Sequence, residues 1–95
     1  MKNNLNSIIQ SAAILKSVGH PIRVKIILAL SKKSSMTVTA LAEELHIDQP
    51  VMSLHLAILR KKNIIKVKKI GKQSEYSISN ISIQQIVNIA YHSPN

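Results

Sequence analysis

The stretch that decides the fold is residues 37–60, which read TVTALAEELHIDQPVMSLHLAILR. Its first part places apolar residues at i, i+3, i+4 and i+7, the spacing of one buried helical face. These residues are Val38, Leu41, Ala42 and Leu45. Thr37 comes directly before them and is the expected N-cap, because its hydroxyl can accept a hydrogen bond from the unpaired amides of a first helical turn. The pattern predicts a short helix that begins after Thr37.

A second helix is predicted after a turn of about three residues. His46 stands where the first helix would end, and histidine tolerates a positive φ better than most residues. Asp48 is the expected second N-cap, and Pro50 lies in the first turn, where its missing N–H costs little. The helix would then run from Gln49 to about Lys62. This arrangement is a helix-turn-helix, the motif that places its second helix in the major groove of DNA.

Two further helices are predicted before this motif. Residues 5–18, LNSIIQSAAILKSV, carry a broad apolar stripe, and Gly19 follows them. Pro21 then begins a helix over residues 21–30, PIRVKIILAL, because proline suits a first helical turn. Residues 32–35 are expected to form a polar loop that leads into the helix-turn-helix.

A β-hairpin and a last helix are predicted after the motif. Residues 64–70 contain β-branched side chains with lysines between them, and residues 74–79 alternate polar and apolar. The turn Gly71-Lys72-Gln73 would join these two strands. Helical spacing returns from Ile81, and residues 92–95 are expected to be a frayed tail. The predicted fold is therefore mainly α with a small β-hairpin, a winged helix-turn-helix of order α-α-α-α-β-β-α.

The size and apolar content of the chain predict one domain that dimerises. The 95 residues include no Phe or Trp, so the core must be built from aliphatic side chains. A thin core in a small chain makes association a source of further burial. We expect a single winged helix-turn-helix domain over residues 1–95, with a homodimer formed from Leu5 to Leu15 and from Ile81 to Ala90, because these stripes are too apolar for free surfaces.

The charge of the chain predicts a polyanionic partner. There are 13 basic and 4 acidic residues, which give a net charge of +9. Six of the basic residues fall between Arg60 and Lys69, at the end of the second motif helix and in the hairpin. Double-stranded DNA is the expected partner. A membrane-surface protein is disfavoured because the lysines do not follow one amphipathic helix.

Several classes of function find no support in the sequence. There is no cysteine, which excludes disulfides and thiolate metal sites. No stretch is apolar over the about 18 residues of a membrane span, and the start, MKNNLNSIIQ, does not resemble a signal peptide, so a cytoplasmic protein is expected. No motif of a catalytic or phosphate-binding site is present, so we expect no enzyme and no cofactor. We also expect no metal site, with His20 and His46 serving as turn residues.

Candidate DNA-binding residues lie on the second motif helix and in the hairpin. They are Gln49, Val51, Ser53, Leu54, His55, Arg60, Lys61, Lys69, Lys72 and Gln73. Val51 and Leu54 either meet thymine methyl groups or pack inside, while Gln49 either pairs with adenine or is solvated. Lys69 and Lys72 are expected to contact phosphates, and the alternative is a solvated strand face. Residues expected in the core of the same helix are Met52, Leu56 and Leu59, with Ile58 beside them.

Three segments resemble the ArsR-type family of small dimeric winged-helix transcriptional repressors. The first is residues 15–30, LKSVGHPIRVKIILAL, the second is residues 38–60, with LAEEL and then QPVMSLHLAILR, and the third is the hairpin, IIKVKKIGKQSEYSIS. The matching positions are Pro21, Arg23, Ile27 and Leu28 in the first segment and Gly71, Lys72, Tyr76 and Ile78 in the hairpin. Each segment is weak alone, but their order and separation are typical of this family.

The resemblance implies a homodimeric repressor that binds an inverted-repeat operator. It places Ser53 and His55 of the family's Ser-x-His pattern near DNA, with phosphate contacts, although His55 could equally be a partly buried brace for the helix. Family members sense metal through cysteines on the first motif helix or through Asp and His pairs on the last helix. This chain has neither, since its last helix offers only His92. A winged-helix module that binds another protein is the alternative function, and the basic hairpin disfavours it.

Overall fold

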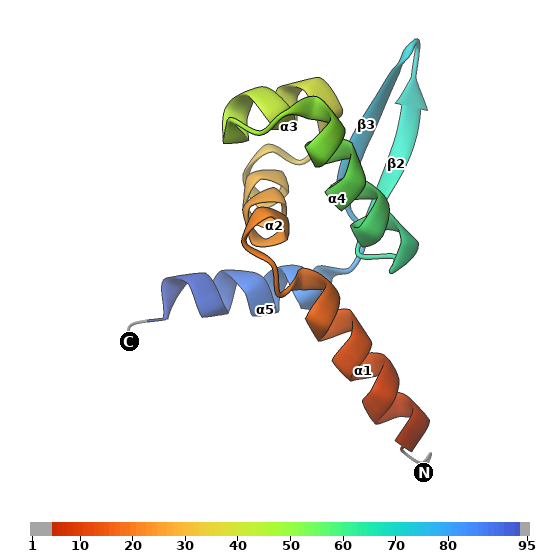
Figure 1. Ribbon diagram of the computed structural model, residues 1–95, viewed down its shortest axis with the longest axis vertical. Helices are drawn as coiled ribbons and strands as arrows, with labels where there is room; N and C mark the ends of the chain where they lie inside the picture. The colour runs from red at the N-terminus through yellow and green to blue at the C-terminus, as the bar shows by residue number, and fades with distance from the viewer. Residues whose placement is uncertain (1–4, 94–95) are drawn as a thin grey trace.

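Within residues 5–93, the part of the chain that the computed structural model describes, helices and short strands follow each other in a winged helix-turn-helix (Figure 1). The elements are α1 (Leu5–Val18), α2 (Pro21–Lys33), β1 (Met36–Thr37), α3 (Val38–Leu45), α4 (Gln49–Lys61), β2 (Ile65–Ile70), β3 (Gln73–Ile78) and α5 (Ile81–His92). The predicted fold class is confirmed. Helices dominate, α3 and α4 form the helix-turn-helix, and β2 and β3 form the wing.

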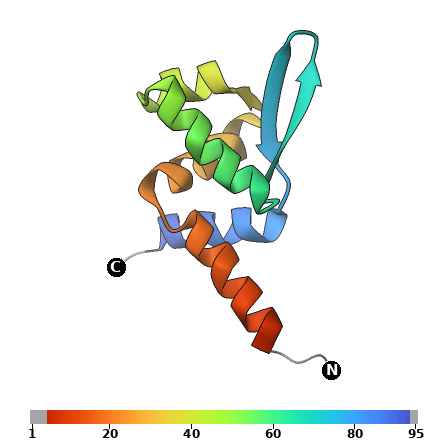
Figure 2. The same ribbon diagram turned by 45° about the vertical axis from the view of Figure 1, so that its right-hand side comes forward.

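The wing and α1 project from opposite ends of the molecule (Figures 1 and 2). Between them, α2 packs against α3, α4 and α5, so that it lies at the centre of the helical part. Helix α5 crosses beneath α2, at the end of the molecule from which α1 extends. This layout keeps α4 and the wing together and sets them apart from most of α1.

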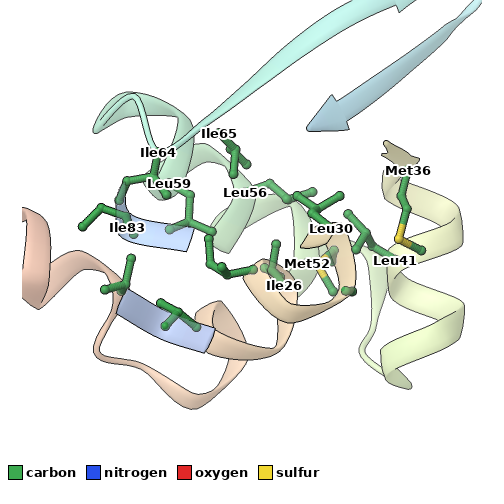
Figure 3. Packing of buried hydrophobic residues seen from close by; sticks show 14 of the residues in the cluster. Ile26, Leu30, Met36, Leu41, Met52, Leu56, Leu59, Ile64, Ile65 and Ile83 are labelled. Carbon is green, nitrogen blue, oxygen red and sulfur yellow. The ribbon is translucent and has the colours of Figure 1, made fainter. Parts of the chain in front are cut away.

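The core consists of apolar side chains from all five helices, with Val18 as its member from α1, together with Met36, Ile64 and Ile65 from outside the helices. Its fully buried members are Ile26, Ile27, Leu30, Leu41, Met52, Leu56, Leu59, Ile64 and Ile65. Figure 3 shows side chains of α2 and α4 pointing toward one another across this cluster. The prediction that Met52, Leu56 and Leu59 face the core is confirmed. Each such side chain contributes about 1.5–3 kcal/mol on burial, so α4 is held to the domain along one full face.

The local signals at both ends of α3 are confirmed. The Thr37 Oγ1 accepts a hydrogen bond from the Ala40 amide at 3.1 Å. His46 ends the helix in the left-handed conformation, with φ 56° and ψ 48°. Asp48 occupies the N-cap position of α4, but its side chain accepts no capping hydrogen bond. Pro50 removes one of the two amides that an N-cap side chain can reach, while the amide of Val51 remains.

The wing belongs to a three-stranded antiparallel sheet of order β1-β3-β2. In the hairpin, Ile65 pairs with Ile78 and Ile70 with Gln73, so Gln73 belongs to a strand and not to the turn. Gly71 in the turn has φ 64°, a conformation that favours glycine. Strand β1 was not predicted, because two residues are too short to show an alternating pattern.

Two helix ends also differ from the sequence-based expectation. Helix α2 continues to Lys33 and ends at Ser34, so the predicted loop over residues 32–35 begins late. Lysines are good helix formers and are favoured at a helix C-terminus, which explains the extra turn. His92 belongs to α5 and not to a frayed tail. The last two residues of the predicted tail, 94–95, lie outside the described residues.

Candidate nucleic-acid interface

The outward face of α4 carries most of the candidate base-contacting residues. Gln49, Val51, Ser53 and Leu54 are all exposed. Leu54 is 60 % exposed and Val51 is 41 % exposed, so neither side chain packs inside. Apolar side chains in such a position can meet thymine methyl groups in the major groove. The buried stripe on the other side of α4 fixes which way this face points.

The end of α4 adds positive charge to the same helix. Arg60 and Lys61 are exposed in its last turn, and Lys62 is its C-cap. A helix C-terminus favours cations without any ligand, so these charges by themselves do not define a binding site. They come shortly before β2 in the sequence, and Lys66, Lys68 and Lys69 of β2 are exposed as well.

The wing presents exposed lysines along its length. Lys66, Lys68, Lys69 and Lys72 are exposed, and so is Gln73. The middle of β3 is held by the pairing of β1 with Glu75 and Tyr76 and by a hydrogen bond of 2.8 Å from the Ser35 hydroxyl to the Glu75 carboxylate. Lys69, Lys72 and Gln73 lie between this anchor and the tip of the hairpin, which projects from the helices (Figure 1). A protruding basic hairpin suits contact with phosphates beside the major groove.

A hollow between α3 and the wing was missed by sequence reasoning. It has a volume of about 600 Å³. Its lining joins the start of α3 to the tip of the wing and consists of Thr37, Val38, Thr39, Ala40, Glu43, Lys72, Gln73, Ser74 and Tyr76. The exposed Thr39 lies beside two of the candidate wing residues in this lining. The pairing of β1 with β3 and the contact of α3 with β3 bring these segments together, and no local sequence pattern shows either of them.

His55 differs from the other candidates because its side chain is buried. It is only 7 % exposed. Its Nδ1 accepts a hydrogen bond from the Arg23 Nε at 3.1 Å, and its ring lies 4.6 Å from the ring of His20, centroid to centroid. Burial, followed by the charges of His20 and Arg23, lowers the pKa of His55 below its ordinary value of 6.5. This geometry supports the interpretation of His55 as a brace for the helix.

The terminal helices expose large apolar side chains. On α1 these are Leu5, Ile8, Ile9 and Leu15, and on α5 they are Ile81, Ile86, Ile89 and Tyr91. Ile83 and Val87 are the members of α5 that pack into the core. Each terminal helix therefore has an apolar face that the described part of the chain leaves uncovered.

Residues 5–93 were also searched for metal sites and for membrane-spanning helices. Within that range, groups of three or more His, Asp or Glu side chains that could hold a metal ion are not found. No helix in the same range has the length and apolar character needed to cross a membrane.

The chain is similar to known transcriptional regulators along most of its length. The family model for the bacterial regulatory proteins of the arsR family matches residues 20–67. An uncharacterised helix-turn-helix transcriptional regulator of Methanocaldococcus jannaschii is 35 % identical over 80 residues, which cover 84 % of this chain and 90 % of that protein. The transcriptional repressor PagR of Bacillus anthracis is 32 % identical over 83 residues, covering 87 % and 83 %.

Solved structures of transcriptional regulators are similar to this chain as well. The crystal structure of Bacillus anthracis PagR superimposes with a TM-score of 0.84 at 31 % identity and covers 92 % of this chain and 99 % of that one. NolR of Sinorhizobium fredii superimposes with a TM-score of 0.82 at 25 % identity over the full length of both chains. The chain therefore belongs to the ArsR family of bacterial regulatory proteins, and it is a DNA-binding transcriptional regulator.

Proposed function

We propose that the protein is a homodimeric repressor that occupies an inverted-repeat operator. The observation that carries this proposal is the outward face of α4, where exposed Gln49, Ser53 and Leu54 stand opposite a fully buried stripe. In this proposal the α4 helices of two protomers enter successive major grooves and read base edges. Bound in this way, the dimer blocks transcription sterically. We infer that the protein acts in the cytoplasm, because the DNA that such a repressor would bind lies there.

The basic residues are assigned to the DNA backbone. Lys69, Lys72 and Gln73 of the wing would contact phosphates that flank each half-site, and Arg60 and Lys61 would contact phosphates beside α4. Support comes from the strand register, which puts Lys69, Lys72 and Gln73 on the tip side of the bond between Ser35 and Glu75. The hairpin itself projects from the helices (Figure 1). Because phosphate contacts release counterions, these residues would supply affinity for any duplex.

The apolar faces of α1 and α5 are assigned to the dimer interface. Ile8 is 64 % exposed and Ile89 is 67 % exposed, and both lie among other exposed aliphatic side chains. Contiguous apolar patches of this kind are uncommon on monomeric proteins. We infer one domain per chain, whose terminal helices pair with those of a second copy. Such a dimer would present two α4 helices related by a two-fold axis, which an inverted repeat would match.

The test is selection of bound sequences from a random duplex library at one stated salt concentration. The expected product is an inverted repeat whose half-sites are centred about 10 base pairs apart, or a multiple of that spacing. A matched control is the double variant Gln49→Ala/Leu54→Ala, which should keep its fold but lose the enrichment. If the wild-type protein enriches no sequence, the proposed function is wrong and the protein-binding alternative gains support. In vitro transcription from a promoter overlapping the selected site should fall as protein is added, and a rise would contradict repression.

A further inference from the structure

One arginine side chain joins three helices of this structure. The Arg23 Nε on α2 donates to the His55 Nδ1 on α4 at 3.1 Å. The Arg23 Nη1 donates to the backbone carbonyl of Ser17 at 3.0 Å. Ser17 lies in the last turn of α1, whose carbonyls have no partner within the helix. The guanidinium thus satisfies an unpaired carbonyl of α1 and at the same time holds the buried ring of α4.

This contact requires a neutral His55. The Nδ1 can accept a hydrogen bond only when it carries no proton, so the ring proton must lie on Nε2. The groups that face the ring are His20, which precedes α2, and Arg23 of α2. The Nδ1 of His20 accepts the Ile22 amide at 3.1 Å. Arg23 is a cation, and among the described residues His20 and Arg23 are the groups whose charges lower the pKa of His55. A second proton on His55 would therefore remove the acceptor and place two cations side by side.

We propose that Arg23 and His55 are positioning residues that set the orientation of α4 relative to α1, and that protonation of His55 releases this brace and reduces discrimination between operator and random DNA. The inference rests on the proposed function, because it concerns how α4 is presented to an operator. In the proposed dimer, α1 belongs to the interface, and α4 must meet the neighbouring half-site with a fixed spacing. The guanidinium is a direct polar link between these two helices, and it is separated from His55 by 32 residues in the sequence.

The quantity to measure is the discrimination between operator and random DNA, not the affinity for the operator alone. Protonation of His55 has a second effect, which raises the affinity for DNA instead of lowering it. A new positive charge near DNA raises affinity for every duplex through the phosphates. Loss of the brace instead affects the operator alone, since only the operator requires a defined position of both α4 helices. The ratio of operator affinity to random-duplex affinity removes the shared charge effect. It isolates the contribution of the orientation of α4.

The experiment measures this ratio at about pH 7.5 and about pH 5.5 at constant salt. For the wild-type protein we expect the ratio to fall by about five-fold or more at the lower pH, the lower end of typical coupling between sites. His55→Asn places an amide oxygen near the position of Nδ1 and does not titrate, so its ratio should not change with pH. His46→Asn is the matched control. It changes an exposed histidine in a left-handed conformation that asparagine also accepts, and it should keep the wild-type pH dependence.

A second pair of variants tests the arginine. Arg23→Met removes the donor and should give a low ratio at both pH values, whereas Lys25→Met removes an exposed cation from the same helix and should leave the ratio at its wild-type value. Nitrogen-detected NMR of the wild-type protein without DNA gives a readout that does not depend on any variant folding. The expected signal at neutral pH is a His55 ring with its proton on Nε2.

The outcomes separate this proposal from the proposed function. A large wild-type ratio that stays constant while the NMR spectrum shows His55 taking up its second proton would overturn the release by protonation, and so would a ring that is still neutral at about pH 5.5. A neutral His55 ring with its proton on Nδ1 would overturn the positioning role, and all three results leave operator binding intact. A ratio near one already at neutral pH would overturn operator binding itself. An Arg23→Met variant that folds and discriminates as well as Lys25→Met would also overturn the positioning role.

Discussion

Thr37 joins the wing to the helix-turn-helix, because its backbone pairs with Glu75 of β3 while its hydroxyl accepts the Ala40 amide at 3.1 Å. We expect Thr37→Ala to lower the free energy of unfolding by about 1 kcal/mol, the usual effect of losing an N-cap. Thr37→Ser should retain most of that stability. Urea unfolding followed by circular dichroism measures the difference.

Asp48→Ala is the control for this cap. Asp48 occupies the same position before α4, but its side chain makes no capping hydrogen bond and is exposed. Its replacement should change the free energy of unfolding by less than about 0.5 kcal/mol, as for other exposed residues. Equal losses at the two positions would mean that the Thr37 hydroxyl does not stabilise α3 in the way the geometry indicates.

The stability of the protein should fall in mild acid because of His55. Burial, then His20 and Arg23, hold the pKa of His55 in the folded state below its ordinary value of 6.5. Just below that value the unfolded chain binds the proton more readily than the folded chain, so stability increases with pH there and is complete above it. His55→Asn should flatten this part of the profile, and His46→Asn should not. The free energy of unfolding measured at several pH values around 6.5 would contradict this if wild type and His55→Asn ran parallel.

A charge placed on the apolar face of either terminal helix should break the proposed dimer. Ile8→Glu on α1 and Ile86→Glu on α5 each put an unpaired carboxylate where we expect a second copy to pack. Leu54→Glu is the matched control, because Leu54 is an exposed aliphatic residue of α4 outside that interface. Sedimentation at micromolar concentration should give dimers for wild type and Leu54→Glu and monomers for the other two. A monomeric wild-type protein at moderate salt would contradict the prediction.

Zinc should have little effect on DNA binding. The chain has no cysteine, and its last helix carries His92 without a second histidine or a carboxylate one turn away. We expect micromolar zinc to leave operator affinity unchanged within a few-fold. A loss of about ten-fold or more that a chelator reverses would reveal a site formed between protomers, with His20, His46 or His92 as its first candidates to replace.

Local signals made much of this fold predictable. The spacing of apolar residues in α3 and the residues at its two ends, Thr37 and His46, act over one or two helical turns, and the structure confirms them. The buried face of α4 was predictable in the same way. Met52, Leu56 and Leu59 are spaced so that they lie on one side of a helix, and all three are buried.

Features that depend on distant partners were not predictable. Strand β1 exists because it pairs with β3, and the nearby bond between Ser35 and Glu75 spans 40 residues. The bond between Arg23 and His55 spans 32 residues, so the sequence left the role of His55 open. The hollow between α3 and the wing depends on the same long-range pairing. Only the packed structure shows which polar side chains meet across such separations.

The wing lysines should supply affinity without specificity. Lys69 and Lys72 are exposed on the protruding hairpin, where phosphates are the expected partners. Changing either to Ala should weaken binding to operator and random duplex about equally. Each change should also reduce the slope of log affinity against log salt by about one unit for every phosphate that a protomer no longer neutralises. A salt titration of each variant on both duplexes measures the two effects together.

The exposed face of α4 should instead supply specificity for the operator. Gln49 and Leu54 point outward from the buried stripe, so their replacement by Ala should cost roughly 1–3 kcal/mol per half-site on the operator and little on random DNA. The salt dependence should stay at its wild-type value, because the same phosphates remain neutralised. The substitution is present in both protomers of a dimer and therefore acts on both half-sites, which doubles the effect. If the Lys69 and Lys72 variants lost discrimination while the Gln49 and Leu54 variants kept it, the assignment of the wing to the backbone and of α4 to the bases would be reversed.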